Sequence, residues 1–379
     1  MRIVILTLPL NTNYGGIMQA YALQTVLERM GHEVTVLHHA VPPQKVPLWR
    51  WPLRYAKRLV KKTLVDHHVL VFRERRARQE LPFLTQHLRR FIDTQLHLRT
   101  LERLTDIKAG EYDAIVVGSD QVWRPRYFKP MWESPMREAF LDFARTWDVK
   151  RIAYAASFGV DNWEYNDVET TDCARLLKLF DIVSVREQSG VRLCEDHLSM
   201  KATHVLDPTM LLTKEDYERL ITREDENDSS EGNFLFAYIL DGTREKNALI
   251  ERMAKERKLT VRRMQVNLAC DSRPIEQRIS PSVGTWLRSF RDASMVVTDS
   301  FHACVFSVLF RKPFIALGNE GRGMSRFLSL LCMFNLQDRL LLSPRSPLPK
   351  TPIDYGKVDT RLEELREVAF GFLRKGLDL

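Results

Sequence analysis

The chain has 379 residues, 44% of them hydrophobic and 9% aromatic, so it is long and apolar enough for two globular domains with full cores. Its five cysteines are odd in number and show no C-x-x-C spacing, which excludes a disulfide framework and a thiolate zinc site and fits a reducing cytoplasm. The net charge of +8 is unevenly placed, because residues 45–78 hold eleven Lys or Arg against two acidic residues.

The first forty residues predict a βαβ unit. A short, β-branched run at residues 3–6 predicts a buried strand, and it lacks the cleavage pattern of a signal peptide. The polar turn at residues 13–16 leads into a helix whose mostly apolar stripe runs from Ile17 to Met30, and Gly31 ends it. Residues 34–37 supply the second strand. Repeats of this unit favour parallel sheets covered on both faces.

The strand rhythm stops at residues 42–108, which begin with prolines and then become basic and helical. Further strands are expected at residues 114–117, 151–154, 182–185, 204–206, 234–240, 259–262, 295–298 and 314–317, with a hydrophilic loop at 222–233 between the two series. A proline-rich stretch at 343–352 precedes an amphipathic helix from Thr360 to about Lys375. No segment approaches the ~18 apolar residues that a membrane span needs.

The sequence therefore predicts an α/β protein with two doubly wound, Rossmann-like domains and a cleft between them. We expect an N-terminal domain over 1–205 that carries the basic insertion 42–108, a C-terminal domain over 206–350, and a helix within 351–379 that packs back on the N-terminal domain. In such sheets, ligands bind beyond the carboxyl ends of the strands. Seven polar turns fall there, at residues 13–16, 118–123, 157–159, 186–188, 207–209, 241–242 and 299–302.

Six motifs at or near these turns are distinctive as a set. They are Asn13-Tyr-Gly-Gly-Ile-Met-Gln-Ala-Tyr-Ala-Leu-Gln24, Gly118-Ser-Asp-Gln-Val-Trp123, Tyr154-Ala-Ala-Ser-Phe-Gly159, Ser184-Val-Arg-Glu187, Leu206-Asp-Pro-Thr209 and Thr298-Asp-Ser-Phe-His-Ala303. In this order, over nearly the whole chain, they resemble the polysaccharide pyruvyl transferase family. The resemblance implies a glycosyltransferase-B-like fold. It also implies transfer of pyruvate from phosphoenolpyruvate to a sugar as a ketal, in capsule, exopolysaccharide or cell-wall glycan assembly.

Donor binding and acid–base chemistry are assigned to the later turns. Ketal formation needs an acid, a base and cations for the donor, and His302 is the first candidate for the acid–base work. Asp120 is a candidate base and Asp299 a candidate orienting group. The alternatives are a histidine that only caps or packs the start of its helix, and aspartates that only accept backbone N–H groups in turns.

Arginine suits phosphoenolpyruvate, because its fork binds two oxygens of a carboxylate or phosphate at once. Arg186 is the main donor-binding candidate, with a surface ion pair as its alternative. Members of the resembled family often carry an arginine two residues before the histidine, where this chain has Ser300. Arg322 or Arg326, in the segment 321–326, is expected to replace it, unless that segment is a flexible loop with solvated arginines.

The acceptor sugar is expected at the earlier turns, where an aromatic face and amide or carboxylate groups lie together. The candidates are Asn13, Tyr14, Gly15, Gly16, Ser119, Gln121 and Trp123. Gln19 and Gln24 are expected to be solvated, with contact to sugar hydroxyls as the alternative, and Asp207-Pro-Thr209 reads as an interdomain turn rather than a catalytic element. No Asp, Glu or His cluster has the spacing of metal ligands, and phosphoenolpyruvate is a co-substrate rather than a cofactor.

Several alternatives remain open. The basic stretch 45–78 permits peripheral contact with an anionic membrane at the inner face, where lipid-linked glycans lie, or only a solvated insertion. No recognised nucleic-acid module accompanies it. The rival functions are a sugar-nucleotide glycosyltransferase, against which the scarcity of acidic residues between 311 and 340 counts, and a non-catalytic glycan- or anion-binding relative, which Ser300 favours.

Overall fold

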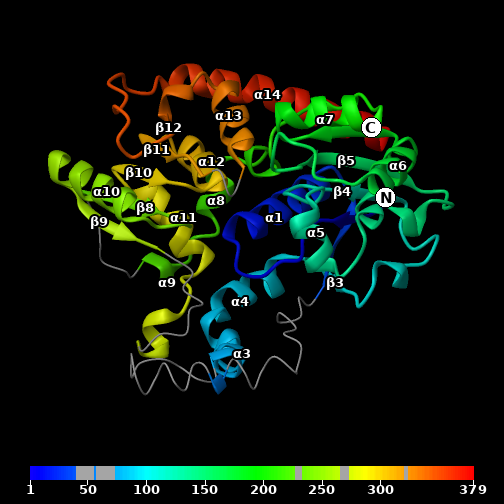
Figure 1. The fold of residues 1–379 in the computed structure, drawn as a ribbon, viewed down its shortest axis with the longest axis horizontal. Coiled ribbons are helices and arrows are strands. Elements are labelled where there is room, and N and C mark those ends of the chain that lie inside the picture. Colours follow the sequence, from blue (N-terminus) through cyan, green and yellow to red (C-terminus); the bar gives the residue numbers. More distant parts are fainter. Residues whose placement is uncertain (40–54, 57–72, 227–232, 265–272, 320–322) are drawn as a thin grey trace.

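The computed structural model describes residues 1–39, 55–56, 73–226, 233–264, 273–319 and 323–379. Two α/β units lie side by side, and a long helix at the end of the chain runs across both (Figure 1). Each unit is built on its own parallel sheet. This arrangement confirms the predicted fold class of two parallel α/β domains.

The first sheet has seven strands in the order β3-β2-β1-β4-β5-β6-β7. Their bounds are β1 (Arg2–Leu6), β2 (Glu33–His38), β3 (Leu98–Thr100), β4 (Ala114–Val117), β5 (Lys150–Ala156), β6 (Ile182–Val185) and β7 (Thr203–His204). Neighbouring strands of this sheet all run parallel to each other. The central strand β4 is buried along its whole length, as expected for a parallel strand covered on both faces.

The second sheet has five strands in the order β12-β11-β10-β8-β9, again all parallel. Their bounds are β8 (Phe234–Tyr238), β9 (Thr260–Arg263), β10 (Met295–Thr298), β11 (Phe314–Leu317) and β12 (Leu340–Leu341). β10 and β11 have the predicted bounds. β3 and β12 are short edge strands that the sequence analysis did not predict, because two or three residues carry no recognisable alternation.

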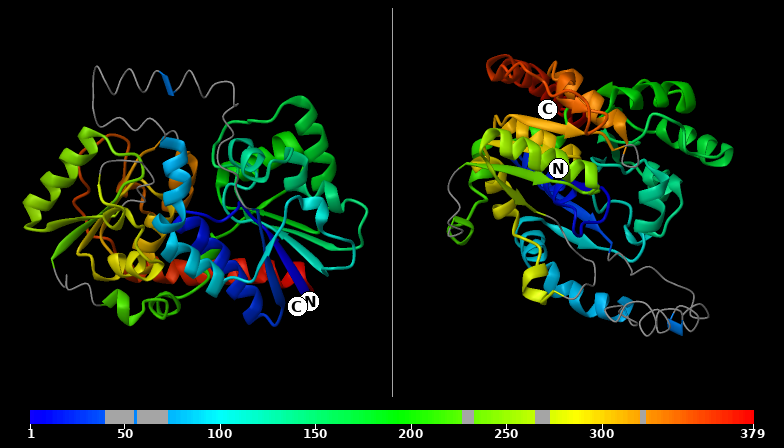
Figure 2. Two further views of the ribbon diagram at one scale, coloured as in Figure 1. Left: turned by 90° about the horizontal axis from the view of Figure 1, so that it is seen from below. Right: turned by 60° about the vertical axis from the view of Figure 1, so that its left-hand side comes forward.

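Helices follow most of the strands and cover the sheets (Figures 1 and 2). Their bounds are α1 (Tyr14–Arg29), α3 (Arg73–Leu84), α4 (Gln86–Gln95), α5 (Pro125–Trp132), α6 (Asp167–Leu177), α7 (Gln188–Leu198), α8 (Lys214–Glu218), α9 (Arg223–Glu226), α10 (Arg244–Arg257), α11 (Val283–Asp292), α12 (Phe301–Leu309), α13 (Met324–Met333) and α14 (Tyr355–Leu377). Side-chain caps explain several starts: Asn166, Thr213 and Ser282 accept the backbone N–H three residues ahead.

The two domains are joined by direct packing near the start of α1. The ring of Tyr14 stacks on Trp286 of α11 with 5.3 Å between ring centres, and its hydroxyl donates to the carbonyl of Pro281 at 2.6 Å. Burial raises the pKa of Tyr14, so the hydroxyl stays protonated and remains a donor. Trp286 and Tyr14 are both fully buried, so this contact belongs to a continuous apolar core.

Helix α14 contacts both domains (Figures 1 and 2). At its first turn, the Tyr355 hydroxyl donates to the Lys312 carbonyl of the second domain. Midway, Arg366 donates to the carbonyls of Met210 and Leu212, at 2.7 Å and 2.6 Å. Near its end, Gly376 lies against Ile182 of β6, where an added Cβ would come within 2.2 Å of the isoleucine side chain.

The basic insertion is described only in part. Trp49, Trp51 and most of 45–78 lie outside the described residues, while α3 and α4 project below the first domain in Figure 1. From α3, Glu80 reaches across to Arg278 of the second domain at 2.8 Å. None of the helices in the described part of the chain combines the length and hydropathy that crossing a bilayer requires.

Candidate functional site

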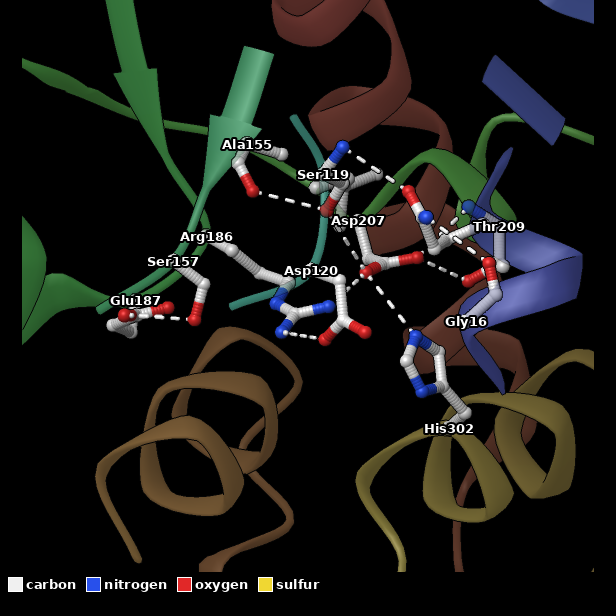
Figure 3. Close-up of polar contacts among 12 residues, drawn as sticks. Gly16, Ser119, Asp120, Ala155, Ser157, Arg186, Glu187, Asp207, Thr209 and His302 are labelled. Carbon is white, nitrogen blue, oxygen red and sulfur yellow. Dashed lines mark hydrogen bonds and ion pairs between the residues drawn. The ribbon is translucent and has the colours of Figure 1, made fainter. Parts of the chain in front are cut away.

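The predicted turns come together between the two sheets, around Arg186 (Figure 3). Arg186 follows β6 and is only 3% exposed. One guanidinium nitrogen, Nη1, donates to Asp207 Oδ2 at 2.7 Å, and Nη2 donates to Asp120 Oδ1 at 3.3 Å. The turns after β4, β6 and β7 therefore meet in one ion-paired cluster, because the carboxyl ends of parallel strands share one edge of the sheet.

His302 enters this cluster from the second domain, on the first turn of α12. Its Nε2 lies 3.6 Å from Asp207 Oδ2, and the ring is 5% exposed. Phe301 packs against it edge-on. On the α1 side, a Cβ added to Gly15 would lie 2.1 Å from His302 Nδ1, so only glycine lets the ring occupy this place.

Asp207 is the carboxylate that Arg186 and His302 both approach. Burial by itself would raise its pKa, but the neighbouring His302 and Arg186, together with the hydrogen bond from the Thr209 hydroxyl, hold the pKa of Asp207 well below its usual range. The group is therefore a stable anion. The sequence analysis read residues 207–209 as an interdomain turn and missed this role; an aspartate directly after a strand was the signal available.

A second buried cation, Arg326, comes from α13. Arg186 and Arg326 lie over the same ring, that of Phe301, with 4.5 Å and 5.7 Å from guanidinium carbon to ring centre. Burial and, to a smaller extent, the neighbouring Arg186 lower the pKa of Arg326 to about 10. Its helix starts at Gly323, which has a φ of +92° and lies so close to the carbonyl of Gly159 that a Cβ would clash. Arg326 thus lies on a helix packed against the first domain; Arg322 falls outside the described residues.

Asp299 occupies a separate polar cluster at the edge of the second sheet. It accepts the backbone N–H groups of Leu240 and Asp241, at 2.6 Å and 3.1 Å, and the ammonium of Lys246 at 2.7 Å. These bonds tie the turn after β8 to the start of α12. Ser300, the N-cap residue of α12, is buried, and its backbone N–H donates to the Thr298 hydroxyl.

The expected acceptor residues have mixed surroundings. Asn13 is exposed and makes no side-chain cap to α1. Ser119 is fully buried and donates to the Ala155 carbonyl at 3.0 Å. Gln121 accepts from Arg124 at 3.2 Å. Gly16 lies at the cluster: an added Cβ would be 3.5 Å from Asp120 Oδ2.

Trp123 has no exposed surface. Its ring stacks on Phe140 with 4.9 Å between ring centres, and its indole N–H donates to the Ala139 carbonyl. Tyr14 is likewise engaged in the interdomain contact described above. The geometry therefore assigns Trp123 and Tyr14 to the core rather than to a sugar-binding face.

The expectation that Gln19 and Gln24 are solvated is wrong. Gln19 is fully buried, donates to the Thr7 hydroxyl and accepts the Ser119 N–H. Gln24 is 2% exposed, and its side-chain amide donates to the Gln95 carbonyl in the segment before β3. Periodicity placed both on the helix correctly, but it could not show that neighbouring segments cover that side of α1.

Glu187 is a further buried carboxylate that the sequence analysis left without a role. Its Oε1 accepts the Ser157 hydroxyl and the N–H groups of Phe158 and Gly159, at 3.0 Å, 2.7 Å and 2.9 Å. It thereby shapes the turn against which Gly323 lies. Over the described ranges of the chain, no group of three or more His, Cys, Asp or Glu residues has metal-binding geometry.

Comparison with known proteins places this site in a family. A sequence model of polysaccharide pyruvyl transferases matches residues 13–321, which include Asp120, Arg186, Asp207 and His302 but not Arg326. The chain belongs to the polysaccharide pyruvyl transferase family. No curated protein matches the chain.

Solved structures of other proteins resemble this family member in fold alone. One is UDP-GlcNAc 2-epimerase from Neisseria meningitidis, with 11% identity, a TM-score of 0.47, and coverage of 99% of this chain and 94% of that chain. Another is the glycotransferase of kitacinnamycin, with 10% identity, a TM-score of 0.46, and coverage of 99% and 98%. A third is an α-glucosyltransferase bound to UDP and DNA, with 9% identity, a TM-score of 0.43, and coverage of 99% and 95%.

Proposed function

We propose that this protein transfers the pyruvyl group of phosphoenolpyruvate to a sugar of a surface glycan or its precursor, forming a ketal. The observation that carries the proposal is the placement of two buried guanidinium groups, Arg186 from the first domain and Arg326 from the second, over the ring next to His302. Phosphoenolpyruvate carries a carboxylate and a phosphate, so a pair of arginines flanking an acid–base group suits it.

The reaction requires one proton donor and one proton acceptor around the donor molecule. His302 protonates the methylene carbon of phosphoenolpyruvate, which leaves a cationic centre at the carbon that bears the phosphate ester oxygen. A sugar hydroxyl attacks that carbon and loses its proton to a base, for which Asp120 is the candidate. Phosphate then leaves, and a second hydroxyl of the sugar closes the ketal and gives its proton to His302, which restores the acid, while the proton on Asp120 passes to the departing phosphate.

The two arginines have different surroundings, and this decides which variant tests the proposal. Arg186 holds Asp120 and Asp207, so its removal would leave two buried carboxylates without their cation and cost about 3–5 kcal/mol of stability. Arg326 lies over the ring of Phe301 on helix α13 of the second domain. Arg326→Gln removes this charge, keeps a polar side chain in its place and leaves the Arg186 pairs with Asp120 and Asp207 intact, so it tests anion binding.

The experiment is calorimetric titration of the purified protein with phosphoenolpyruvate, comparing Arg326→Gln with Arg288→Gln. Arg288 is a matched control, since it is a buried arginine of the same domain that pairs with Asp292 instead. We expect the dissociation constant to rise at least ~10-fold in Arg326→Gln, equivalent to about 1.4 kcal/mol, and to stay unchanged in the control.

Two results would overturn this function. Binding of a nucleoside diphosphate by the wild-type protein, without binding of phosphoenolpyruvate, would move the assignment to sugar-nucleotide glycosyl transfer. If the wild-type protein binds neither phosphoenolpyruvate nor a nucleoside diphosphate, the remaining alternative is a non-catalytic relative that binds a glycan or another anion. If phosphoenolpyruvate binds, incubation with candidate glycans and mass spectrometry of the products tests the transfer.

A further inference from the structure

We infer that Asp207 is a positioning residue for His302, holding the imidazole in one orientation with Nε2 towards the ion-paired cluster. The catalytic consequence rests on the proposed function, whereas the coupling between the two side chains does not. Asp207 lies in the turn after β7, and its carboxylate is buried at 3% exposure. It belongs to the chain segment that connects the two sheets, opposite the helix that carries His302.

The two oxygens of Asp207 have separate contacts (Figure 3). Oδ1 accepts the backbone N–H and the hydroxyl of Thr209, at 3.0 Å and 2.5 Å, and these bonds fix the plane of the carboxylate. Oδ2 accepts from Arg186 at 2.7 Å and faces His302 Nε2 at 3.6 Å. Thr209 thus fixes Oδ1, while Oδ2 faces Arg186 and His302.

The His302 ring cannot easily turn away from Asp207. Gly15 lies against Nδ1 so closely that it has no room for a methyl group, and Phe301 packs against the ring edge-on. The ring is therefore held between α1 and its own helix, with Nε2 as the nitrogen aimed at the carboxylate. This arrangement fixes which ring nitrogen faces the ion-paired cluster.

Charged groups face this region from four segments of the described chain. Asp207 and Asp120 are carboxylates, while Arg186 and Arg326 are cations. Among these groups, Asp207 lies within ion-pair distance of His302, at 3.6 Å. Because Coulomb interaction weakens with distance, this nearest carboxylate has the strongest electrostatic effect on the orientation of the ring.

The same contact aligns the two domains. Asp207 bonds Arg186 of the first domain and faces His302 of the second, and Arg326 of the second domain lies over the ring next to His302. Asp207 is thus the carboxylate at which side chains of both domains meet.

The test follows the environment of the His302 ring by NMR, with its ring signals assigned by their loss in His302→Gln. In Asp207→Asn we expect the ring carbon and nitrogen signals of His302 to move, because the amide no longer presents a charged oxygen to Nε2. Asp216→Asn is the control: Asp216 is another buried carboxylate bonded to an arginine, Arg29, and the His302 signals should match those of wild type. Identical His302 ring signals in wild type and Asp207→Asn would overturn the role of Asp207.

A second measurement uses the wild-type protein and holds even if Asp207→Asn fails to fold. The nitrogen chemical shifts of neutral His302 report its tautomer, and we expect the proton on Nε2, which faces Asp207. A proton on Nδ1 would overturn the inference. In the activity assay, Asp207→Asn should lower kcat for pyruvyl transfer, whereas Asp216→Asn should leave it unchanged. If the wild type shows no transfer from phosphoenolpyruvate, the proposed function fails, and the ring signals of His302 still decide the role of Asp207.

Discussion

Gly15→Ala is the sharpest single test of the site, because it perturbs His302 without replacing any charged group. The new methyl carbon would lie 2.1 Å from His302 Nδ1, 2.4 Å from Cγ and 2.8 Å from Cβ. Reaching ordinary contact at 3.4 Å requires the ring to move by about 1.3 Å. The neighbouring backbone of α1 is helical, so alanine itself is favoured there by about 0.5–1 kcal/mol.

The clash outweighs that gain, since overpacking a close-packed core costs about 1–3 kcal/mol. We expect Gly15→Ala to lower the free energy of unfolding by a net 1–2 kcal/mol, and to reduce kcat for pyruvyl transfer by about 10²-fold, because a displacement of about 1 Å in an active site costs that much. Chemical denaturation and steady-state kinetics measure the two effects.

Gly16→Ala is the matched control for this test. It lies on the same helical turn, but its new methyl meets the exposed side chain of Asn13 at 3.1 Å, which can move aside. Its stability should stay within about 0.5 kcal/mol of wild type. Removing the ring as well, in Gly15→Ala with His302→Ala, should restore the lost stability. Equal stability of Gly15→Ala and Gly16→Ala, together with a wild-type kcat in Gly15→Ala, would refute the close contact with His302.

Three further outcomes are expected. Tyr14→Phe removes the hydroxyl that donates across the domain interface and should lower the free energy of unfolding by about 1 kcal/mol; no change would show that the bond does not stabilise the interface. Arg29 lowers the pKa of Asp216 to about 2, so the stability from this pair is complete above the usual aspartate pKa and is lost as the pH falls towards 2. The free energy of unfolding of wild type should therefore fall by about 1 kcal/mol, after allowance for solvent screening, between pH 5 and 2, and Asp216→Asn should not show this fall in chemical denaturation. In a Cys270→Ser background one thiol per native chain, the exposed Cys332, should react with a thiol reagent, and the buried thiols should react only on unfolding; reaction of more than one thiol in the native protein would contradict this burial.

Much of the fold could be predicted from the sequence where apolar runs are short, β-branched and bounded by turns. The runs at β4, β6, β10 and β11 have the predicted limits, because burial on both faces leaves no polar alternation to blur their ends. The strands β3 and β12 could not be found in this way. Their residues pair with neighbouring strands through the backbone, which any side chain permits.

The candidate site was predictable as a place but not as a set of contacts. Parallel strands end at one edge, so the approach of Asp120 and Arg186 follows from the order of the motifs. That His302 faces Asp207 rather than Asp120 depends on how the two domains pack, which local sequence does not encode. Likewise, the aromatic ring of Trp123 fits a sugar site or a core equally well, and only the fold shows that Phe140 covers it.

The route of α14 has a consequence for the order in which the protein is made. Its C-terminal turns pack against β5 and β6 of the first domain: Phe372 contacts Tyr154, and Gly376 lies against Ile182. These turns leave the ribosome after the whole second domain. During synthesis, part of the sheet of the first domain therefore stays uncovered until α14 has been made. A protein cut after residue 350 would expose the same apolar surface.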